Sequence, residues 1–213
     1  MKLIGSLTSP YTRKVRVVLA EKKIECEFVE DNPWNAETIV PGLNPLGKVP
    51  VLLLDDDSTL FDSRVIVEYL DGMTPNNRLM PASGRQRTRI RRWEALADGM
   101  QDAAVAAYLE TKRPKNEQSA DFIARQKEKI GRALEAVSAE LANQPWCSGN
   151  AFSLADIAIG CSLDYLDLRL KDIGWRGQHA NLLRLHGELM QRPAFAETAP
   201  QELVKGAPKP DKP

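Results

Sequence analysis

The first residues that could do chemistry are Ser9 and Pro10, in the segment Thr8-Ser9-Pro10-Tyr11. A serine directly followed by proline is a strong signal for the start of a helix. The N-terminus of a helix carries about half a unit of positive charge, so it stabilises an anion placed beside it. It also lowers the pKa of a thiol from the free value of about 8.5. Ser9 therefore predicts a site that holds a bound thiol as its thiolate, although a plain N-cap gives the same pattern.

The second candidate is the pair Val49-Pro50, at the entrance of an apolar run in residues 44–52. Proline cannot donate a hydrogen bond to a strand ladder. A Val-Pro pair at such an entrance is also a place where a cis peptide bond can be kept, and cis prolines are usually purposeful. A cis bend would turn the N–H and C=O of Val49 outward, free to pair with an extended peptide ligand. The alternative is an ordinary loop containing proline and glycine.

The third candidate is Asp62-Ser63, where a predicted strand again meets a predicted helix. A helix N-terminus with a serine hydroxyl is a receptor for a carboxylate. In a small sheet this junction would lie beside the one that carries Ser9. The alternative is that both residues only cap the helix.

The elements that must position these residues form a small mixed sheet with helices. Alternation and turn residues predict strands at residues 2–4, 26–30, 49–54 and 59–61, with helices after residues 9 and 62. The first strand, helix and second strand require a parallel pair joined by a right-handed crossover. The last two strands are joined by a four-residue turn, so they form an antiparallel hairpin.

The composition changes near residue 74, and everything after it has a helical pattern. We predict a first domain over residues 1–76, a linker over residues 77–84 and an all-helical domain over residues 85–200. Residues 154–166 are apolar nearly all round, so their helix belongs in the middle of a bundle. Residues 201–213 are rich in lysine and proline, and we predict a disordered tail.

The bulk composition of the 213 residues excludes several classes of function. Lys plus Arg and Asp plus Glu are equal at 29 each, so nucleic acid is not an expected partner. No run approaches the roughly 18 apolar residues of a membrane span, and the start lacks a signal peptide. The three cysteines are far apart with no CxxC pair, which fits a reducing cytoplasm. His179 and His186 have no second ligand at metal spacing, so we predict no metal site.

Taken together, the three candidates resemble the thioredoxin-like domain of the glutathione S-transferase superfamily, in its bacterial, serine-type form. The matching pieces are Ser9-Pro10-Tyr11, Asn44-Pro45-Leu46-Gly47-Lys48-Val49-Pro50, Asp62-Ser63, and a helical-domain capping box with a hydrophobic staple, Phe152-Ser153-Leu154-Ala155-Asp156. The resemblance covers about residues 1 to 195. It implies a thioredoxin-like α/β domain that binds glutathione, followed by an all-helical domain that holds a second substrate.

The resemblance also implies roles for single residues. The backbone of Val49, beside Pro50, would pair with the cysteinyl part of glutathione. Ser63, helped by Asp62, would hold the γ-glutamyl carboxylate, and Lys48 could reach a glutathione carboxylate. Ser9 would hydrogen-bond the glutathione sulfur.

The differences between this chain and other classes of the family reduce the number of expected reaction mechanisms. The alpha, mu and pi classes use a tyrosine at the end of the first strand, where this chain has Gly5-Ser6. The omega and related classes have a cysteine where this chain has Ser9, and a serine cannot form a mixed disulfide. We therefore expect the glutathione thiolate to add to an electrophile. Thr8 and Tyr11 are back-up hydroxyls for the same spot.

The expected function is a cytoplasmic, homodimeric transferase of detoxification that joins glutathione to a small electrophile and needs no metal. One alternative keeps the fold and uses glutathione as a cofactor, as in isomerases and dehalogenases of the superfamily. Another is a non-catalytic interaction protein such as stringent starvation protein A. The intact set of Ser9, Val49-Pro50 and Ser63 speaks against that second alternative.

Some features of the helical domain have more than one interpretation. Asp98 and Asp102 could pair with arginines of a partner subunit or help to hold the amino group of glutathione. Three aromatic residues could line a pocket for the electrophile, although core packing is the better interpretation for the first: Trp93, Tyr108 and Trp175. The crowded arginines could be a solvated face, a dimer contact or an anion-binding rim: Arg85, Arg87, Arg89, Arg91 and Arg92.

Overall fold

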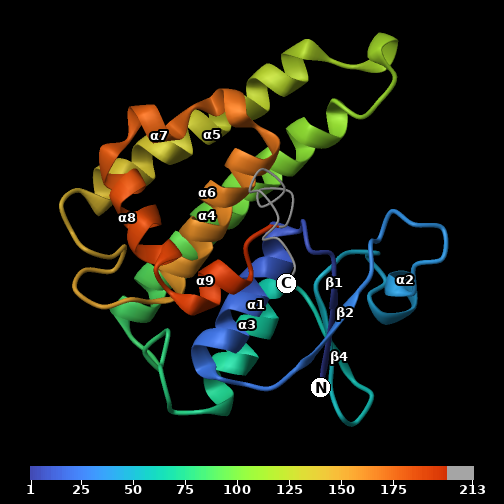
Figure 1. Cartoon of the computed structure of the whole chain (residues 1–213), viewed down its shortest axis with the longest axis vertical. Coiled ribbons are helices and arrows are strands. Elements are labelled where there is room, and N and C mark those ends of the chain that lie inside the picture. Colours follow the sequence, from blue (N-terminus) through green and yellow to red (C-terminus); the bar gives the residue numbers. More distant parts are fainter. Residues whose placement is uncertain (201–213) are drawn as a thin grey trace, which may run out of the picture.

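The computed structural model describes residues 1–200, so the predicted tail of residues 201–213 lies outside the described part. The N-terminal region forms a four-stranded sheet in the order β2-β1-β3-β4 (Figure 1). Strands β1 and β2 are parallel, whereas β3 is antiparallel to both of its neighbours, which confirms the predicted mixed sheet. The strands are β1 (Lys2–Gly5), β2 (Glu27–Glu30), β3 (Val51–Leu53) and β4 (Thr59–Leu60).

Two helices pack against each other between the sheet and the helical region, α1 (Pro10–Lys22) and α3 (Ser63–Met73) (Figure 1). Helix α1 is the crossover between the parallel strands. The valines of α1 (Val15, Val17 and Val18) are fully buried, as are Ile66 and Leu70 of α3. The short helix α2 (Val40–Leu43) lies on the other side of the sheet, where Val40 packs with Ile4 of β1 and Val51 of β3.

The rest of the described chain is helical, as predicted. It contains α4 (Arg85–Glu110), α5 (Ala120–Leu141), α6 (Leu154–Arg169), α7 (Trp175–Gln178), α8 (Ala180–Met190), α9 (Pro193–Glu197) and the 3-10 helices η1 (Lys115–Glu117) and η2 (Lys171–Ile173). The sequence pattern did not predict the short helices α7 and α9. Within residues 1–200, no helix combines the length and the apolar character that crossing a membrane requires.

Helix α6 lies in the middle of this bundle, as its apolar surface predicts, and packs along α4. Gly160 allows a close approach there, because a Cβ atom at this position would lie 2.6 Å from Leu189 and 2.7 Å from Phe195. Both contacts are far below normal van der Waals separation. The glycine therefore brings α8 and α9 directly against the central helix.

Three of the observed strands, β2, β3 and β4, are shorter than predicted, and the differences in β3 and β4 concern the site. Val49 and Pro50 lie outside β3, and Phe61 lies outside β4. Proline has no N–H to donate to the ladder, so β3 can begin only after Pro50. The residues before the strand are thereby left to form the loop that the candidate site uses.

The segment that follows α3 and leads to the bundle is held by Lys22 of α1, whose ammonium group is buried. Its Nζ atom donates to Asp71 at 2.9 Å and to the carbonyls of Thr74 at 3.2 Å and Asn76 at 2.9 Å. Helix α3 ends at Met73 and α4 begins 12 positions on, and the predicted linker of residues 77–84 falls in that interval. The division into two domains at this linker stays a prediction.

Ser153 and Asp156 form the predicted capping arrangement at the start of α6. The backbone N–H of Ser153 donates to Oδ2 of Asp156 at 2.9 Å. Its hydroxyl donates to the same oxygen at 3.0 Å. Asp156 also accepts from the backbone N–H of Cys147 at 2.7 Å, so one carboxylate ties the preceding loop to the helix.

We predict that Asp156→Ala lowers the free energy of unfolding by about 3 kcal/mol, because it leaves buried N–H groups without acceptors. Urea titration followed by circular dichroism measures this loss. Asp121 provides a matched control, since it lies in the first turn of α5 but is exposed. The interpretation fails if Asp121→Ala is as costly as Asp156→Ala.

Candidate functional site

The sheet register brings the three predicted motifs to one edge. Ile4 of β1 pairs with Val51 of β3, so the C-terminal end of β1 lies beside the start of β3. Leu52 pairs with Leu60, so the end of β4 lies beside the same start. The loop to Ser9 follows β1, the Val49-Pro50 pair precedes β3, and the Asp62-Ser63 junction follows β4. The three motifs therefore meet at one edge of the sheet.

Ser9 is the N-cap of α1, as predicted. Its Oγ atom accepts from the backbone N–H of Thr12 at 3.2 Å. That bond uses the oxygen as an acceptor, so the O–H of this half-buried serine can still be donated to a ligand. Gly5 completes the close packing, because a Cβ atom there would lie 2.4 Å from Thr12. The end of β1 therefore leaves no room for a side chain at position 5.

The other two candidate hydroxyls are engaged with protein atoms. Thr8 Oγ1 lies 3.2 Å from Ser6 Oγ and shares a hydrogen bond with it. The Tyr11 hydroxyl donates to the carboxylate of Asp102. Burial and the hydrogen bond to Asp102 raise the pKa of Tyr11 above its ordinary value. The Tyr11 proton is thus committed to α4 rather than to the space beside Ser9.

The Val49–Pro50 peptide bond is cis, as predicted. Within residues 1–200, no hydrogen bond uses the backbone N–H or C=O of Val49. The buried Asn44 holds this loop, since its Nδ2 atom donates to the Lys48 carbonyl at 2.8 Å and its Oδ1 atom accepts from the Leu46 N–H at 3.0 Å. No separate role was predicted for Asn44, although an asparagine followed by Pro-Leu-Gly is a sequence signal for such a loop. The side chain of Lys48 is exposed.

Asp62 caps α3 by accepting from the backbone N–H of Arg64 at 2.9 Å. Ser63 is the first residue of the helix and is buried. In the described part of the chain, its hydroxyl has no hydrogen-bond partner. The junction therefore offers a hydroxyl together with the N–H groups of a helix N-terminus, which is the arrangement that suits a carboxylate.

A buried charge cluster lies behind these motifs, and the sequence analysis did not predict it. The Lys14 ammonium group of α1 is fully buried and contacts Glu94 at 3.0 Å and Asp98 at 2.9 Å. Asp98 also accepts from Nε of Arg64 on α3 at 2.9 Å. Burial raises the pKa of Asp98, although the charge of Lys14 opposes that shift. The cluster joins α1, α3 and α4 immediately below the helix N-termini of the site.

The acids and arginines of the bundle are paired within the chain. Asp98 contacts Lys14 and Arg64 of the same chain, and a role of Asp98 or Asp102 toward a partner subunit or the amino group of glutathione stays a prediction. Most arginines of the crowded segment also have partners in the same chain: Arg87 and Arg91 contact Glu68, Arg91 contacts Glu94, and Arg89 and Arg92 contact Glu140. Trp93 and Trp175 are almost completely buried, so neither lines an open pocket.

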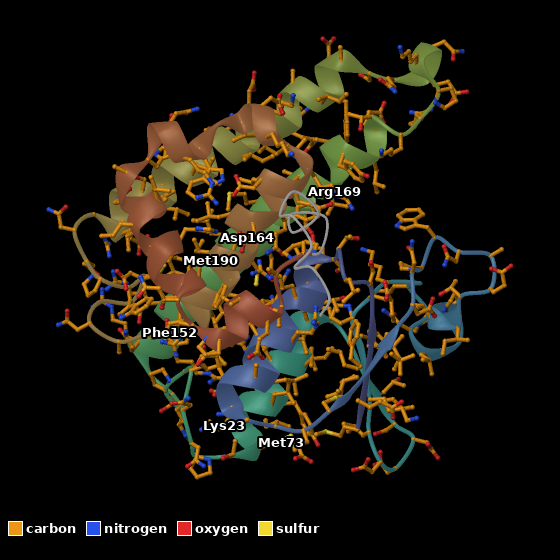
Figure 2. The ribbon with its side chains drawn as sticks, viewed as in Figure 1. Lys23, Met73, Phe152, Asp164, Arg169 and Met190 are labelled. Atoms are coloured by element: carbon orange, nitrogen blue, oxygen red, sulfur yellow. The ribbon has the colours of Figure 1, made fainter. Side chains whose placement is uncertain are left out.

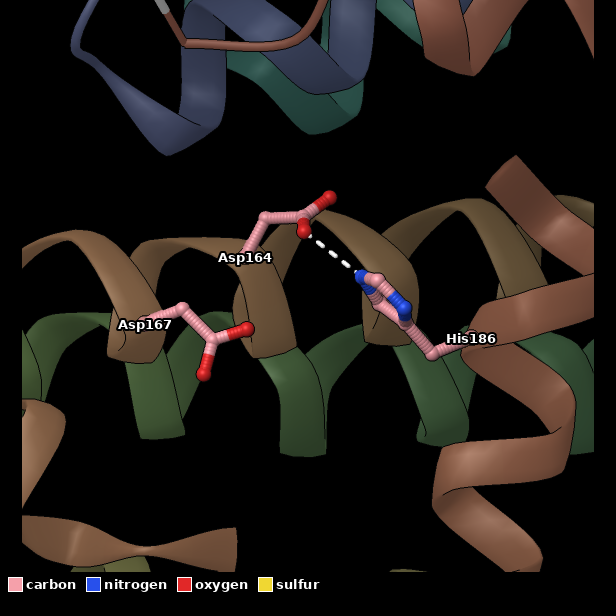
Figure 3. Close-up of side chains that lie close together, drawn as sticks. All are labelled: Asp164, Asp167 and His186. Atoms are coloured by element: carbon pink, nitrogen blue, oxygen red, sulfur yellow. Dashed lines mark hydrogen bonds and ion pairs between the residues drawn. The ribbon is translucent and has the colours of Figure 1, made fainter. Parts of the chain in front are cut away.

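A second cluster contains the buried Asp164 and His186 and the half-buried Asp167, whose ligand atoms lie within 4.8 Å of one another (Figure 3). The sequence spacing of the histidines did not reveal these carboxylates. Asp164 accepts from Nε2 of His186 at 2.7 Å and from Arg13 of α1. Burial opposes ionisation of Asp164, but His186 and Arg13 outweigh it and hold its pKa below the usual range.

The oxygens of the second carboxylate, Asp167, are also occupied. Oδ1 accepts from the indole of Trp175 at 2.9 Å, and Oδ2 accepts from Arg176 at 2.6 Å. A metal ion would have to displace these donors and lie among guanidinium groups. The arrangement is therefore better described as an ion-pair network that fastens α1 and α8 to α6.

Comparisons with known proteins identify the family. Residues 8–73 match the family described as glutathione S-transferase, N-terminal domain, and residues 120–187 match its C-terminal domain. The chain is 40% identical over 200 residues to the uncharacterized GST-like protein YibF of Escherichia coli, covering 94% of this chain and 98% of that protein. The chain therefore belongs to the glutathione S-transferase superfamily.

Solved structures agree with this assignment. A glutathione S-transferase from Methylobacillus flagellatus, with glutathione bound, has a TM-score of 0.91 and 49% identity, covering 93% of this chain and 98% of that one. Another from Methylobacterium radiotolerans, in complex with glutathione sulfonate, has a TM-score of 0.90 and 40% identity, covering 93% and 94%. The two-part architecture of a sheet followed by a helical region is thus the glutathione S-transferase architecture.

We predict that Lys14→Met lowers the free energy of unfolding by about 3–5 kcal/mol, because it leaves Glu94 and Asp98 buried without their cation. Chemical denaturation measures the loss. Arg64→Ala is the control, since the Arg64 side chain is 51% exposed and its pair with Asp98 should be worth less than about 1 kcal/mol. Equal losses in the two variants would show that burial of Lys14 is not what matters.

Proposed function

We propose that this protein is a glutathione transferase that joins glutathione to a small electrophile. The observation that carries the proposal is the meeting, at one edge of the sheet, of groups that still have a hydrogen-bonding position to offer and that are complementary to each part of glutathione. These groups are the Ser9 hydroxyl, the backbone of Val49 and the first turn of α3. Two structural neighbours with glutathione or its sulfonate bound support the same conclusion.

The proposed binding mode assigns one part of the tripeptide to each motif. The N–H and C=O of Val49, turned outward before Pro50, pair with the cysteinyl backbone. Ser63 and the N-terminus of α3, with Asp62, hold the γ-glutamyl end. Lys48 is exposed on the same loop and meets a glutathione carboxylate. The sulfur then lies at the N-terminus of α1.

The proposed mechanism uses thiolate stabilisation. The Ser9 O–H donates to the sulfur, and the partial positive charge of the α1 N-terminus favours the ionised form. The thiol proton goes to solvent. The sulfur then forms a bond to the electrophilic carbon, and the electrons of the broken bond leave with the displaced group or move along the acceptor. Thr8 and Tyr11 are the weaker candidates for this role, because their hydroxyls are engaged with Ser6 and Asp102.

We predict that Ser9→Ala keeps the affinity for glutathione within a few-fold but lowers kcat/KM for conjugation by about a hundredfold. A loss of this size is typical when one hydrogen-bond donor to an anion in an active site, here the thiolate, is removed. The pKa of the bound thiol should rise by about one unit or more. Ultraviolet absorbance of the thiolate against pH measures the pKa, and calorimetry measures binding.

Tyr11→Phe is the matched variant for that test. It removes a hydroxyl two positions away that already donates to Asp102. The assignment of the catalytic hydroxyl to Ser9 is wrong if Tyr11→Phe abolishes turnover while Ser9→Ala leaves the rate and the thiol pKa unchanged.

The same experiments separate the alternatives. Turnover without net loss of glutathione would indicate a glutathione-dependent isomerase or dehalogenase. Absence of both heat and thermal shift on adding glutathione would favour a non-catalytic interaction protein. A cytoplasmic location and a role in detoxification belong to the proposed function and await fractionation and growth tests.

A homodimer is also part of the proposal, and the outer face of α3 supports it. Val65, Tyr69 and Met73 recur at a spacing of four, so they form one stripe, and they are 48%, 38% and 46% exposed. A stripe of this kind on a short helix is suited to burial against a second copy of the chain.

We predict that Tyr69→Glu shifts the protein from twice the mass of the chain to the mass of one chain in light scattering, because a charge on this stripe would have to be buried without a partner. Leu183 on α8 is the control, with a similar exposure of 42% at another surface. If the unmodified protein is a monomer, or if Leu183→Glu dissociates the dimer equally, the stripe is not the interface.

A further inference from the structure

The C-terminal ends of α4 and α6 carry a cluster that the proposed mechanism does not use. We call it the Tyr108 cluster, and it consists of Tyr108, Lys112, Tyr165 and Arg169. The guanidinium carbon of Arg169 lies 4.6 Å from the centre of the Tyr108 ring, and the Lys112 ammonium nitrogen lies 4.8 Å from it. Two cations thus share one aromatic ring, and Arg169 also interacts with the Tyr165 hydroxyl.

The Tyr108 cluster can be reached from solvent. Lys112 is exposed and Tyr108 and Arg169 are half-buried, whereas Tyr165 is buried. Arg169 is the last residue of α6, whereas Asp164 of the buried ion-pair network lies more than one turn deeper in the same helix (Figure 2). In the described part of the chain, Lys112 forms no ion pair with a carboxylate. The exposed cation is therefore available to an incoming anion.

The cluster is connected to the thiol end of the proposed site through Tyr11. This residue lies two positions after Ser9, and its hydroxyl donates to Asp102 of α4. Tyr108 follows Asp102 by six residues, or about 9 Å along the helix. Tyr165 of α6 is close enough to Tyr11 to interact with it electrostatically. A molecule attached to a sulfur beside Ser9 could therefore extend along Tyr11 to the two cations.

The charged groups between Ser9 and the Tyr108 cluster also determine which ligand this region can bind. Asp102 is a carboxylate on this path, and it accepts a hydrogen bond from the Tyr11 hydroxyl. Cations at the C-terminal ends of helices can serve only to balance the helix dipole. That explanation accounts for the position of Lys112 and Arg169, but it does not require both to lie over one half-buried tyrosine next to the path from Ser9.

We propose that the Tyr108 cluster is an acceptor subsite selective for electrophiles that carry a carboxylate, which Lys112 and Arg169 bind while the reacting carbon lies at the glutathione sulfur. The inference rests on the proposed function. The half-buried aromatic rings of Tyr11 and Tyr108 provide an apolar path for the body of the acceptor. The electrophile is then held with its anionic group away from the thiolate, so the two negative charges do not repel at close range.

A suitable probe pair is 4-chloro-3,5-dinitrobenzoate and its methyl ester, which differ in the charge of one group opposite the chlorine. In both, the thiolate sulfur bonds to the carbon that bears chlorine, and chloride leaves with the electron pair of the broken bond. The thiol proton goes to solvent. Dividing each enzymatic kcat/KM by the uncatalysed rate constant removes the intrinsic difference in reactivity.

We expect the corrected acid-to-ester ratio to exceed one in the unmodified protein. Lys112→Gln and Arg169→Gln should each lower it about threefold to tenfold, through KM for the acid, with the ester changed less than about twofold. Arg169→Lys should keep most of the preference. Lys115→Gln is the matched control, because it removes an exposed charge three residues from Lys112. Unchanged ratios in both glutamine variants would overturn the subsite.

A binding measurement separates this inference from the proposed function. The probe is the glutathione conjugate of each acceptor, with calorimetry as the readout. If neither acceptor turns over but the acid conjugate binds more tightly than the ester conjugate, and Lys112→Gln abolishes the difference, the subsite stands and the transferase reaction does not. If the ester turns over and both conjugates bind equally to all variants, the transferase stands and the subsite is wrong.

Discussion

The antiparallel pairing of β3 with both β1 and β4 is the constraint on which the candidate site depends. It places the start of one strand beside the ends of two others, so three loops distant in sequence meet at one edge. Val51 and Leu52 point to opposite faces of the sheet and are both fully buried, in two separate apolar clusters, so a slip of one residue would exchange the side chains that fill these clusters. The hydrophobic pattern of a three-residue strand thereby determines where the backbone of Val49 is presented.

Helix α1 connects that edge to the bundle through charges rather than through apolar contacts alone. It has three buried cations, and each has a carboxylate partner from another element: Arg13 with Asp164, Lys14 with Glu94 and Asp98, and Lys22 with Asp71. Buried ion pairs contribute little net stability, but removing one partner is costly. Alternative packings of α1 would leave a cation unpaired, so the pairs select one orientation of the helix that begins at Ser9.

The difference between contacts among neighbouring residues and ion pairs between distant residues explains which parts of the structure the sequence predicts. The N-cap at Ser9, the cis bond before Pro50 and the cap at Asp62 depend on neighbouring residues, so local patterns were sufficient for them. The partners of Lys14 lie 80 and 84 residues away, and no local pattern encodes them. The commitment of the Tyr11 hydroxyl to Asp102 escaped prediction for the same reason, as did the carboxylates beside His186.

The two halves of the molecule therefore contribute to recognition in different ways. The sheet edge uses backbone groups and helix N-termini, which side-chain substitution changes little, and these suit a constant ligand such as glutathione. The ends of α4 and α6 use side chains such as Tyr108 and Arg169, which can change without disturbing the buried ion pairs of the same helices. The Tyr11–Asp102 bond joins the halves next to Ser9. In the proposed mechanism, the constant half therefore holds the sulfur while the variable half selects what the sulfur attacks.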